Sequence, residues 1–210
     1  MNQQKQKDNA NELWSGDQGI GRLWQMIVDE VTKQAADEPE LVTYFHDAVL
    51  SHNSLEAALA YNLALKLDSN ILSAMTIRQV FTEALTTDLE ITDKMCRDLA
   101  AYVERDPACD QYSLPLLYFK GFHALQIYRI AHWLWSNDRK SLALYLQNRV
   151  SEIFAVDIHP AESGNIKGFD EPFTLLEARD RIAIPNVVEF IDNDRRRGHG
   201  IVCEGPLGLR

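Results

Sequence analysis

The chain contains 210 residues, of which 46% are hydrophobic, so it can bury the core of one domain or of two small ones, and global disorder is excluded. Its 21 basic and 31 acidic residues give a formal net charge of -10. This charge repels phosphate backbones and anionic membrane surfaces, so we expect no nucleic acid and no membrane as partner. Cys96, Cys109 and Cys203 form no C-x-x-C pair, which argues against a disulfide framework or a zinc site and favours a cytoplasmic location.

Residues 1–20 are rich in Asn, Gln, Lys and Asp and lack the apolar stretch of a secretory signal, so we expect a disordered tail. The most apolar region, Leu114–Trp135, is interrupted by charged residues such as Lys120 and Arg129. These side chains are costly in lipid, so this region is predicted to be a buried helix.

Residues 21–152 are predicted to form a helical domain. Apolar residues recur there at helical spacing, and Gly121 is the one glycine between Gly21 and Asn148. Asn53 or Ser54 is expected to cap the third helix. The expected helices are Leu23–Ala36, Glu40–His52, Leu55–Leu67, Ile71–Leu85, Ile91–Glu104, Pro115–Ser136 and Ser141–Ser151.

The character of the chain changes at Ile153. Residues Ile153–Ile158 alternate enough to predict a short strand, which His159 and Pro160 end. Residues 162–210 contain six of the ten glycines and are expected to be a poorly structured tail, with short helices at most near 173–181 and 187–192. The fold class is therefore mainly α, with one strand and an irregular tail.

Asp106 is the first candidate for chemistry. It precedes Pro107, which is the usual pattern for an N-cap followed by the first residue of a helix. We favour capping over a functional role on this pattern alone. His123 and His132 lie nine residues apart, on opposite faces of one helix, so they cannot share a metal and are expected to be hydrogen-bonded structural histidines.

Asp157 and His159 flank Ile158, so in a strand both side chains point to the same face and could form a carboxylate–imidazole pair. Trp133 and Trp135 are expected to pack between helices instead of stacking on bases. The remaining candidates lie in the tail: the basic run 195–197 is expected to be a solvated turn, and the sequence around His199 is no phosphate-binding loop.

Several long motifs together resemble the serine acetyltransferase family. They are R-D-P-A at 105–108, Y-S-L-P-L-L-Y-F-K-G-F-H-A-L-Q at 112–126, Y-R-I-A-H-W-L-W at 128–135, L-Q-N-R at 146–149 and V-D-I-H-P at 156–160. The resemblance extends from about Leu23 to Ala161, and it implies an enzyme of cysteine biosynthesis that acetylates the hydroxyl of L-serine with acetyl-CoA as co-substrate.

The resemblance also implies an architecture and roles for two residues. The N-terminal helical domain builds a homo-oligomer, a dimer of trimers, and the C-terminal domain is a left-handed β-helix that residues 153–161 begin. Serine is a poor nucleophile at neutral pH, so a histidine base takes its proton. By motif, Asp106 matches the serine-binding aspartate and Asp157 the aspartate that orients the base. No metal and no permanently bound cofactor is implied.

The sequence departs from the family pattern after Ala161. The D-H-A-T-G motif that supplies the catalytic histidine is absent from the 210 residues, as are the hexapeptide repeats that form the acetyl-CoA groove. No catalytic base and no acetyl-CoA-binding residue is therefore identified. The terminal isoleucine that docks into O-acetylserine sulfhydrylase also has no counterpart, so that partner is not expected.

Two hypotheses follow. The chain is a serine acetyltransferase, catalytically incomplete as it stands, or it is a non-catalytic oligomerisation module. The missing D-H-A-T-G motif favours the second. In that case aromatic side chains such as Tyr128, Trp133 and Trp135 are expected to be buried between chains. The abrupt change near Pro160 suggests a frameshift, an altered splice or a fusion.

Overall fold

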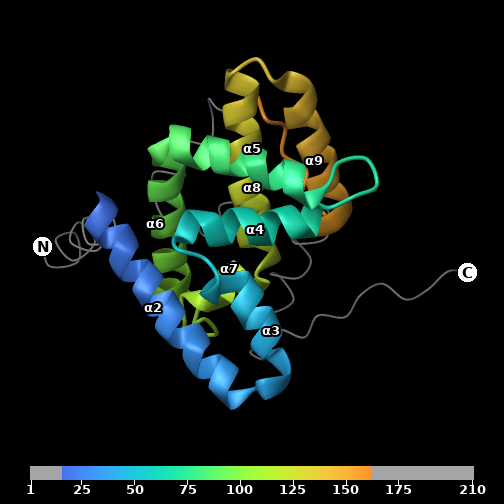
Figure 1. The fold of residues 1–210 in the computed structure, drawn as a ribbon. Coiled ribbons are helices and arrows are strands. Elements are labelled where there is room, and N and C mark those ends of the chain that lie inside the picture. Colours follow the sequence, from blue (N-terminus) through green and yellow to red (C-terminus); the bar gives the residue numbers. More distant parts are fainter. Residues whose placement is uncertain (1–15, 162–210) are drawn as a thin grey trace, which may run out of the picture. The chain divides into compact units, whose positions relative to one another are not determined.

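The structure, a computed structural model, describes residues 16–161, and this part is mainly helical (Figure 1). No strand occurs within these residues, and none of their helices is long and apolar enough to cross a membrane. The elements are α2 (Gly16–Asp37), η1 (Pro39–Leu41), α3 (Val42–Phe45), η2 (His46–Leu50), α4 (Leu55–Leu67), α5 (Ala74–Thr87), α6 (Leu89–Arg105), α7 (Ser113–Tyr118), α8 (Lys120–Ser136) and α9 (Lys140–Phe154).

Short polar side chains cap α4, α5 and α6, and in α5 the Ser73 hydroxyl accepts the N–H of Thr76. The Ser54 hydroxyl accepts the N–H of Ala57 at the start of α4, which confirms the predicted cap. The Asp88 carboxylate accepts the N–H of Glu90 at the start of α6. Helix α5 begins three residues later than predicted, because the Ser69 hydroxyl accepts the N–H groups of Ile71 and Leu72 and holds them in a turn.

Two predicted helices are each divided. The expected helix Pro115–Ser136 is two helices, because Phe119 has extended backbone angles (φ -85°, ψ 108°) between α7 and α8. The expected helix Glu40–His52 contains 3-10, α and π segments. The Asn62 amide donates to the carbonyl of Ala48 inside the π segment, so a buried polar side chain satisfies a backbone group there.

The expectations for both ends of the domain need correction. Residues 16–20, assigned to a disordered tail, are the first residues of α2, whereas residues 1–15 lie outside the described part. The predicted strand Ile153–Ile158 is wrong at its start, because Ile153 and Phe154 belong to α9 and Ala155 ends that helix in the left-handed region (φ 58°). Phe154 continues the buried face of α9, so helical packing prevails over alternation.

Residues 156–160 keep the period of two that suggested a strand. Val156 and Ile158 are half-buried and Pro160 is buried, whereas Asp157 and His159 are exposed. A strand needs a hydrogen-bonded partner, and residues 16–161 provide none for this segment. The segment is therefore a single extended chain that follows the helices.

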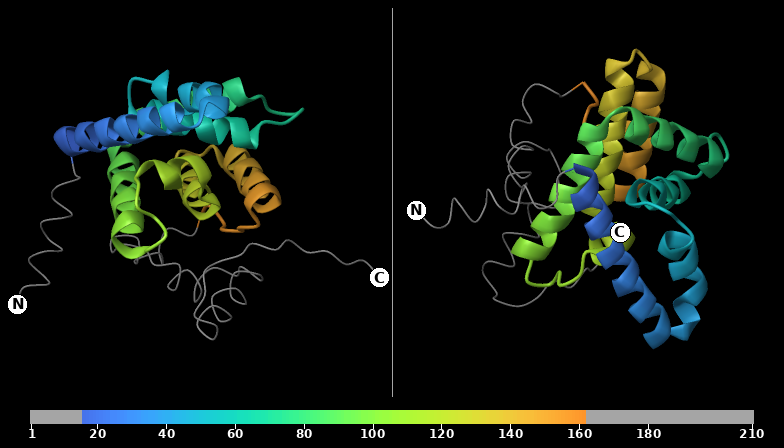
Figure 2. Two further views of the ribbon diagram at one scale, coloured as in Figure 1. Left: turned by 90° about the horizontal axis from the view of Figure 1, so that it is seen from below. Right: turned by 60° about the vertical axis from the view of Figure 1, so that its left-hand side comes forward.

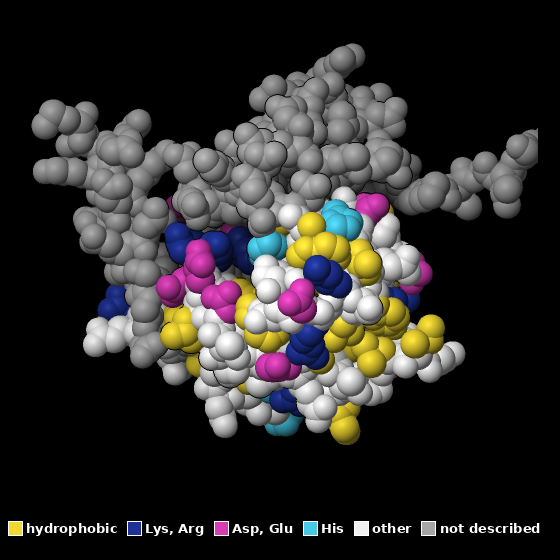
Figure 3. All heavy atoms as spheres, turned by 90° about the horizontal axis from the view of Figure 1, so that it is seen from above, with side chains coloured by type: hydrophobic (Ala, Val, Ile, Leu, Met, Phe, Trp, Pro, Cys, Tyr) yellow, Lys and Arg dark blue, Asp and Glu magenta, His cyan; other side chains and the backbone are white. Residues whose placement is uncertain are grey.

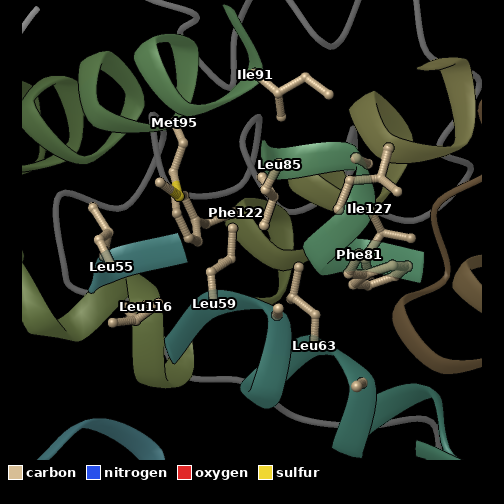
Figure 4. Close-up of a cluster of buried hydrophobic side chains, with 14 of the residues drawn as sticks. Leu55, Leu59, Leu63, Phe81, Leu85, Ile91, Met95, Leu116, Phe122 and Ile127 are labelled. Atoms are coloured by element: carbon tan, nitrogen blue, oxygen red, sulfur yellow. The ribbon is translucent and has the colours of Figure 1, made fainter. Parts of the chain in front are cut away.

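Helix α8 lies at the centre of the domain and packs against α5, α6, α7 and α9. Eleven of its residues are buried. Figure 2 shows α2, α3 and α4 on one side and α6, α8 and α9 on the other. Apolar side chains from α4, α5, α6, α7 and α8 converge in one cluster (Figure 4), which includes Leu59, Phe81, Met95, Leu116 and Phe122. Full burial contributes about 1.5–3 kcal/mol for each large side chain.

A buried polar cluster joins α6 to α8. The Arg129 guanidinium donates to both carboxylate oxygens of Asp98, at 2.5 and 3.2 Å. The Gln126 amide donates to the same carboxylate at 2.8 Å, and its oxygen accepts from Arg129 at 2.8 Å. All three side chains are buried, so neither charge is compensated by water and each depends on the other.

A second buried polar group explains the break between α7 and α8. His123 is 1% exposed, and its Nε2 lies 2.8 Å from the carbonyl of Leu116, so Nε2–H donates to a carbonyl near the end of α7. The prediction of a hydrogen-bonded structural histidine is confirmed here. Burial lowers the pKa of His123 from 6.5 to about 4, and the hydrogen bond to Leu116 opposes this change.

Asp98→Ala is expected to lower the free energy of unfolding by about 3–5 kcal/mol, because it removes the carboxylate that pairs with the buried Arg129 charge. The double variant Asp98→Leu/Arg129→Met removes both charges and is expected to cost much less. Urea denaturation measures both values. An equal decrease in the free energy of unfolding in the single and double variants would show that an unpaired Arg129 charge is not what destabilises the single variant.

His123 is expected to make the domain less stable as the pH falls. Its pKa is lower in the folded than in the unfolded protein, so the unfolded chain binds more protons between about pH 6.5 and 4, and stability is lost across this window. The loss is on the order of 2–3 kcal/mol. His123→Gln is expected to flatten the pH dependence of urea-denaturation midpoints there, and an unchanged slope would contradict this role.

Candidate functional site

Asp106 occupies a turn directly after α6. Its Oδ1 accepts the N–H of Ala108 at 2.9 Å, and its carbonyl accepts the N–H of Cys109 at 2.9 Å. The expectation of an N-cap is therefore corrected: no helix begins at Pro107, and α7 begins at Ser113. An Asp side chain stabilises such a turn as readily as a helix start, which is why the sequence pattern fits both.

The turn leaves part of the Asp106 carboxylate available. Asp106 is half-buried, and its Oδ2 has no hydrogen-bond partner within residues 16–161. A carboxylate with one oxygen fixed by the backbone and the other open to solvent can accept a hydrogen bond from a cation such as an ammonium group.

Helix α2 holds the far end of the same loop. The Glu30 carboxylate accepts the N–H of Tyr112 at 3.1 Å and that of Ser113 at 2.8 Å. The Gln34 amide donates to the side chains of Gln111 and Ser113. Residues 106–113 are thus tied to α6 at one end and to α2 at the other, so the position of Asp106 depends on two helices far apart in the sequence.

Asp157 lies on the extended segment after α9. Its Oδ1 accepts the Gln147 amide at 2.7 Å, and both Asp157 and His159 are exposed on the outer side of the segment, as alternation predicted. The suggested carboxylate–imidazole pair is not formed. The His159 ring instead packs edge-on against Trp135 at 5.0 Å between centroids, and its Nδ1 accepts the N–H of Ala161 at 3.1 Å.

Helices α8 and α9 anchor the segment that carries Asp157. The His132 Nδ1–H donates to the carbonyl of Pro160 at 2.7 Å, which confirms a structural, hydrogen-bonded role for His132. Ile158 lines a small pocket with residues of both helices: Ile127, Tyr128, Ala131, Gln147 and Val150. The pocket has room for about one water molecule, so it is too small for serine or acetyl-CoA.

No interaction within residues 16–161 joins the two candidate aspartates: Asp106 and Asp157 share no hydrogen bond or ion pair and belong to different helix ends. This part of the chain also holds no cluster of His, Cys, Asp and Glu that could bind a metal ion. Cys96 and Cys109 are free thiols, and burial raises the pKa of Cys96 to about 12, so this thiol is a poor nucleophile. The candidates at 195–197, His199 and Cys203 lie outside the described residues.

The aromatic side chains of α8 face inward. Tyr128 is 8% exposed, and Trp133 and Trp135 are half-buried against the core, which confirms helix packing. Their burial between chains stays a prediction. Figure 3 shows charged side chains of both signs among hydrophobic ones on one face. The most exposed large apolar side chains in residues 16–161 are Ile71 (84%), in the connection between α4 and α5, and Met75 (73%), in the first turn of α5.

Sequence reasoning missed the residues that hold the two aspartates. Gln147 stands in the L-Q-N-R motif, and Glu30 lies in α2, more than eighty residues from the loop that it binds. Neither has a local signal of function, because a Gln or Glu on an amphipathic helix is most often solvated. The one signal in the sequence was that Gln147 belongs to the L-Q-N-R motif of the family.

The chain is similar to proteins of known function over two thirds of its length. The family "Serine acetyltransferase, N-terminal" matches residues 23–127. Serine acetyltransferase of Escherichia coli K12 is 50% identical over 139 residues, which are 66% of this chain and 51% of the relative. The chain therefore spans about half the length of the curated relatives that it matches.

Solved structures agree with the sequence comparison. The structure of Neisseria gonorrhoeae serine acetyltransferase in complex with serine is 50% identical, with a TM-score of 0.65 over 70% of this chain and 59% of that one. A serine acetyltransferase complex with CoA is 48% identical, with a TM-score of 0.66 over 68% of this chain and 60% of that one. This chain, with its helical domain, therefore belongs to the serine acetyltransferase family.

Proposed function

We propose that this chain is a serine acetyltransferase subunit whose helical domain positions Asp106 and Asp157 for transfer of an acetyl group from acetyl-CoA to L-serine. The observation that carries the proposal is that both aspartates of the family motifs are held in fixed backbone settings by the helical domain. Similarity to relatives solved with serine and with CoA supports the choice of substrates.

In this proposal Asp106 binds the substrate. Its Oδ1 is engaged by the turn, so its open Oδ2 accepts a hydrogen bond from the ammonium group of serine. Asp157 orients a histidine base and stabilises the imidazolium that forms. The base takes the hydroxyl proton as the serine oxygen attacks the thioester carbonyl, the C–O bond forms, the C–S bond breaks, and the proton passes to the leaving thiolate of CoA.

We further propose that residues 156–161 form the start of the β-helix, which the period of two in their burial supports. The 210 residues contain no identified catalytic base, because the D-H-A-T-G motif is absent from the sequence. His159 cannot serve as it stands, since its ring packs on Trp135 and its Nδ1 accepts a backbone N–H. General-base catalysis contributes about 10²–10⁴ in rate.

A non-catalytic oligomerisation module is the second candidate, and two observations favour it. The sequence lacks the base motif. The structure also exposes Ile71 and Met75, beside half-buried Leu72, at the connection between α4 and α5. Exposed apolar side chains of this size favour contact with another chain, here a homo-oligomer built by the helical domain.

Release of CoA thiol from acetyl-CoA tests catalysis by the purified chain. We expect the same rate with and without L-serine, measured against a blank for the protein thiols, while circular dichroism shows a folded helical protein. Serine-dependent turnover would place a base within the 210 residues and contradict catalytic incompleteness. In that case Asp106→Asn should raise KM for serine at unchanged stability, because Asn keeps the Oδ1 acceptor for Ala108.

Light scattering tests the second candidate. The chain is expected to form oligomers, and Ile71→Ser/Met75→Ser to shift them toward monomer, because this variant removes exposed apolar surface that a partner chain would cover. Leu89→Ser is the matched control, since Leu89 is 69% exposed at the start of α6, away from that connection. A wild-type monomer would rule out the oligomerisation module.

A further inference from the structure

Gln147 connects the helical domain to the carboxylate of Asp157. It lies in α9, is half-buried, and its Nε2 donates to Asp157 Oδ1 at 2.7 Å. Together with Ile158, it also lines the small pocket between α8, α9 and the extended segment. No other hydrogen bond to the Asp157 side chain is formed within the described part of the chain.

The backbone on both sides of Asp157 is already fixed by packing. Val156 packs against the core, and half-buried Ile158 lines a small pocket together with residues of α8 and α9. Two residues further on, buried Pro160 is held through its carbonyl by His132. The inward residues thus set where Asp157 stands, and what remains free is the rotation of its side chain.

We propose that Gln147 is a positioning residue that selects the rotamer of Asp157, so that α9 and not the β-helix orients the aspartate of the proposed base pair. The proposal rests on the proposed function of Asp157. It is carried by the hydrogen bond from Gln147, by the anchored backbone and by the open carboxylate oxygen that this arrangement leaves.

The chemistry of a glutamine suits this task. Its amide is a neutral donor, so it fixes Oδ1 without cancelling the negative charge, whereas Lys or Arg in its place would form an ion pair with the carboxylate. Oδ2 then remains to accept a hydrogen bond from an imidazole N–H, which is how a carboxylate orients a histidine base. The role of Gln147 is thus to hold one oxygen and present the other.

Carbon-13 NMR of the aspartate carboxyl groups in the intact chain tests this arrangement. The Asp157 resonance is assigned by its loss in Asp157→Asn. Gln147→Leu removes the donor at similar size and is expected to move this resonance. Asn148→Leu is the matched control, because Asn148 is the next residue in α9 and its amide binds Glu152 instead. It is expected to leave the Asp157 resonance in place.

A double-mutant cycle of Gln147→Leu and Asp157→Asn gives a second reading. If the two side chains interact, their effects on the folding equilibrium constant are coupled by about two- to tenfold. Coupling at the lower end is expected, because Asp157 is exposed and water competes for its carboxylate. An unmoved resonance together with additive effects would overturn the proposal.

A kinetic measurement separates failure of this inference from failure of the proposed function. In any assembly that shows serine-dependent CoA release, including one with a full-length relative, Gln147→Leu is expected to lower kcat about tenfold and leave KM for serine unchanged. If no assembly shows turnover while the NMR resonance moves, the catalytic role fails and the contact stands. If turnover is present and Gln147→Leu leaves kcat unchanged, Gln147 does not position Asp157 for catalysis.

Discussion

The buried contact between Asp98 and Arg129 is the constraint on which the arrangement of this domain depends. Two charges removed from water are tolerated only when they face each other, and here a forked guanidinium meets both oxygens of the carboxylate, with Gln126 completing the cluster. The contact fixes how α6 lies against α8. Apolar packing alone would tolerate small shifts between two helices, whereas a bidentate ion pair does not.

Both candidate aspartates depend on this pair of helices. Asp106 follows the last residue of α6, about two turns after Asp98, and Asp157 lies on a segment that α8 anchors through His132. The helical domain therefore fixes the backbone around both of these residues. It holds one aspartate in a turn and sets the backbone around the other, so that a β-helix would start from a position that the helices define.

Sequence reasoning reached the helical fold because its signals are local. The caps at Ser54 and the apolar spacing of α4 required no knowledge of the rest of the chain. It failed where distant residues decide the outcome. The break at Phe119 depends on the hydrogen bond from His123 to the carbonyl of Leu116. The helical state of Ile153 and Phe154 depends on the packing of Phe154 in the core. The turn at Asp106 and a helix cap share one sequence pattern, so only the position of α7 separates them.

The same limit applies to the candidate site. Family motifs identified Asp106 and Asp157, but their supports, Glu30 and Gln147, are ordinary polar residues on helices and acquire meaning only through the contacts that they make. The alternation around residue 158 correctly placed Asp157 and His159 on one face, although residues 156–160 form no strand. Alternating apolar residues indicate which side chains are buried, whereas a strand also requires a neighbouring strand as hydrogen-bond partner.

The central claim is that the helical domain by itself holds the segment with Asp157 in place. Nuclear Overhauser contacts between the methyl protons of Ile158 and those of Val150 and Ile127 test it most directly in the intact chain, because these side chains line one pocket. The account predicts strong contacts and non-random chemical shifts for residues 156–160. Absent contacts with random-coil shifts would show that the segment is free, and that the helices do not position Asp157.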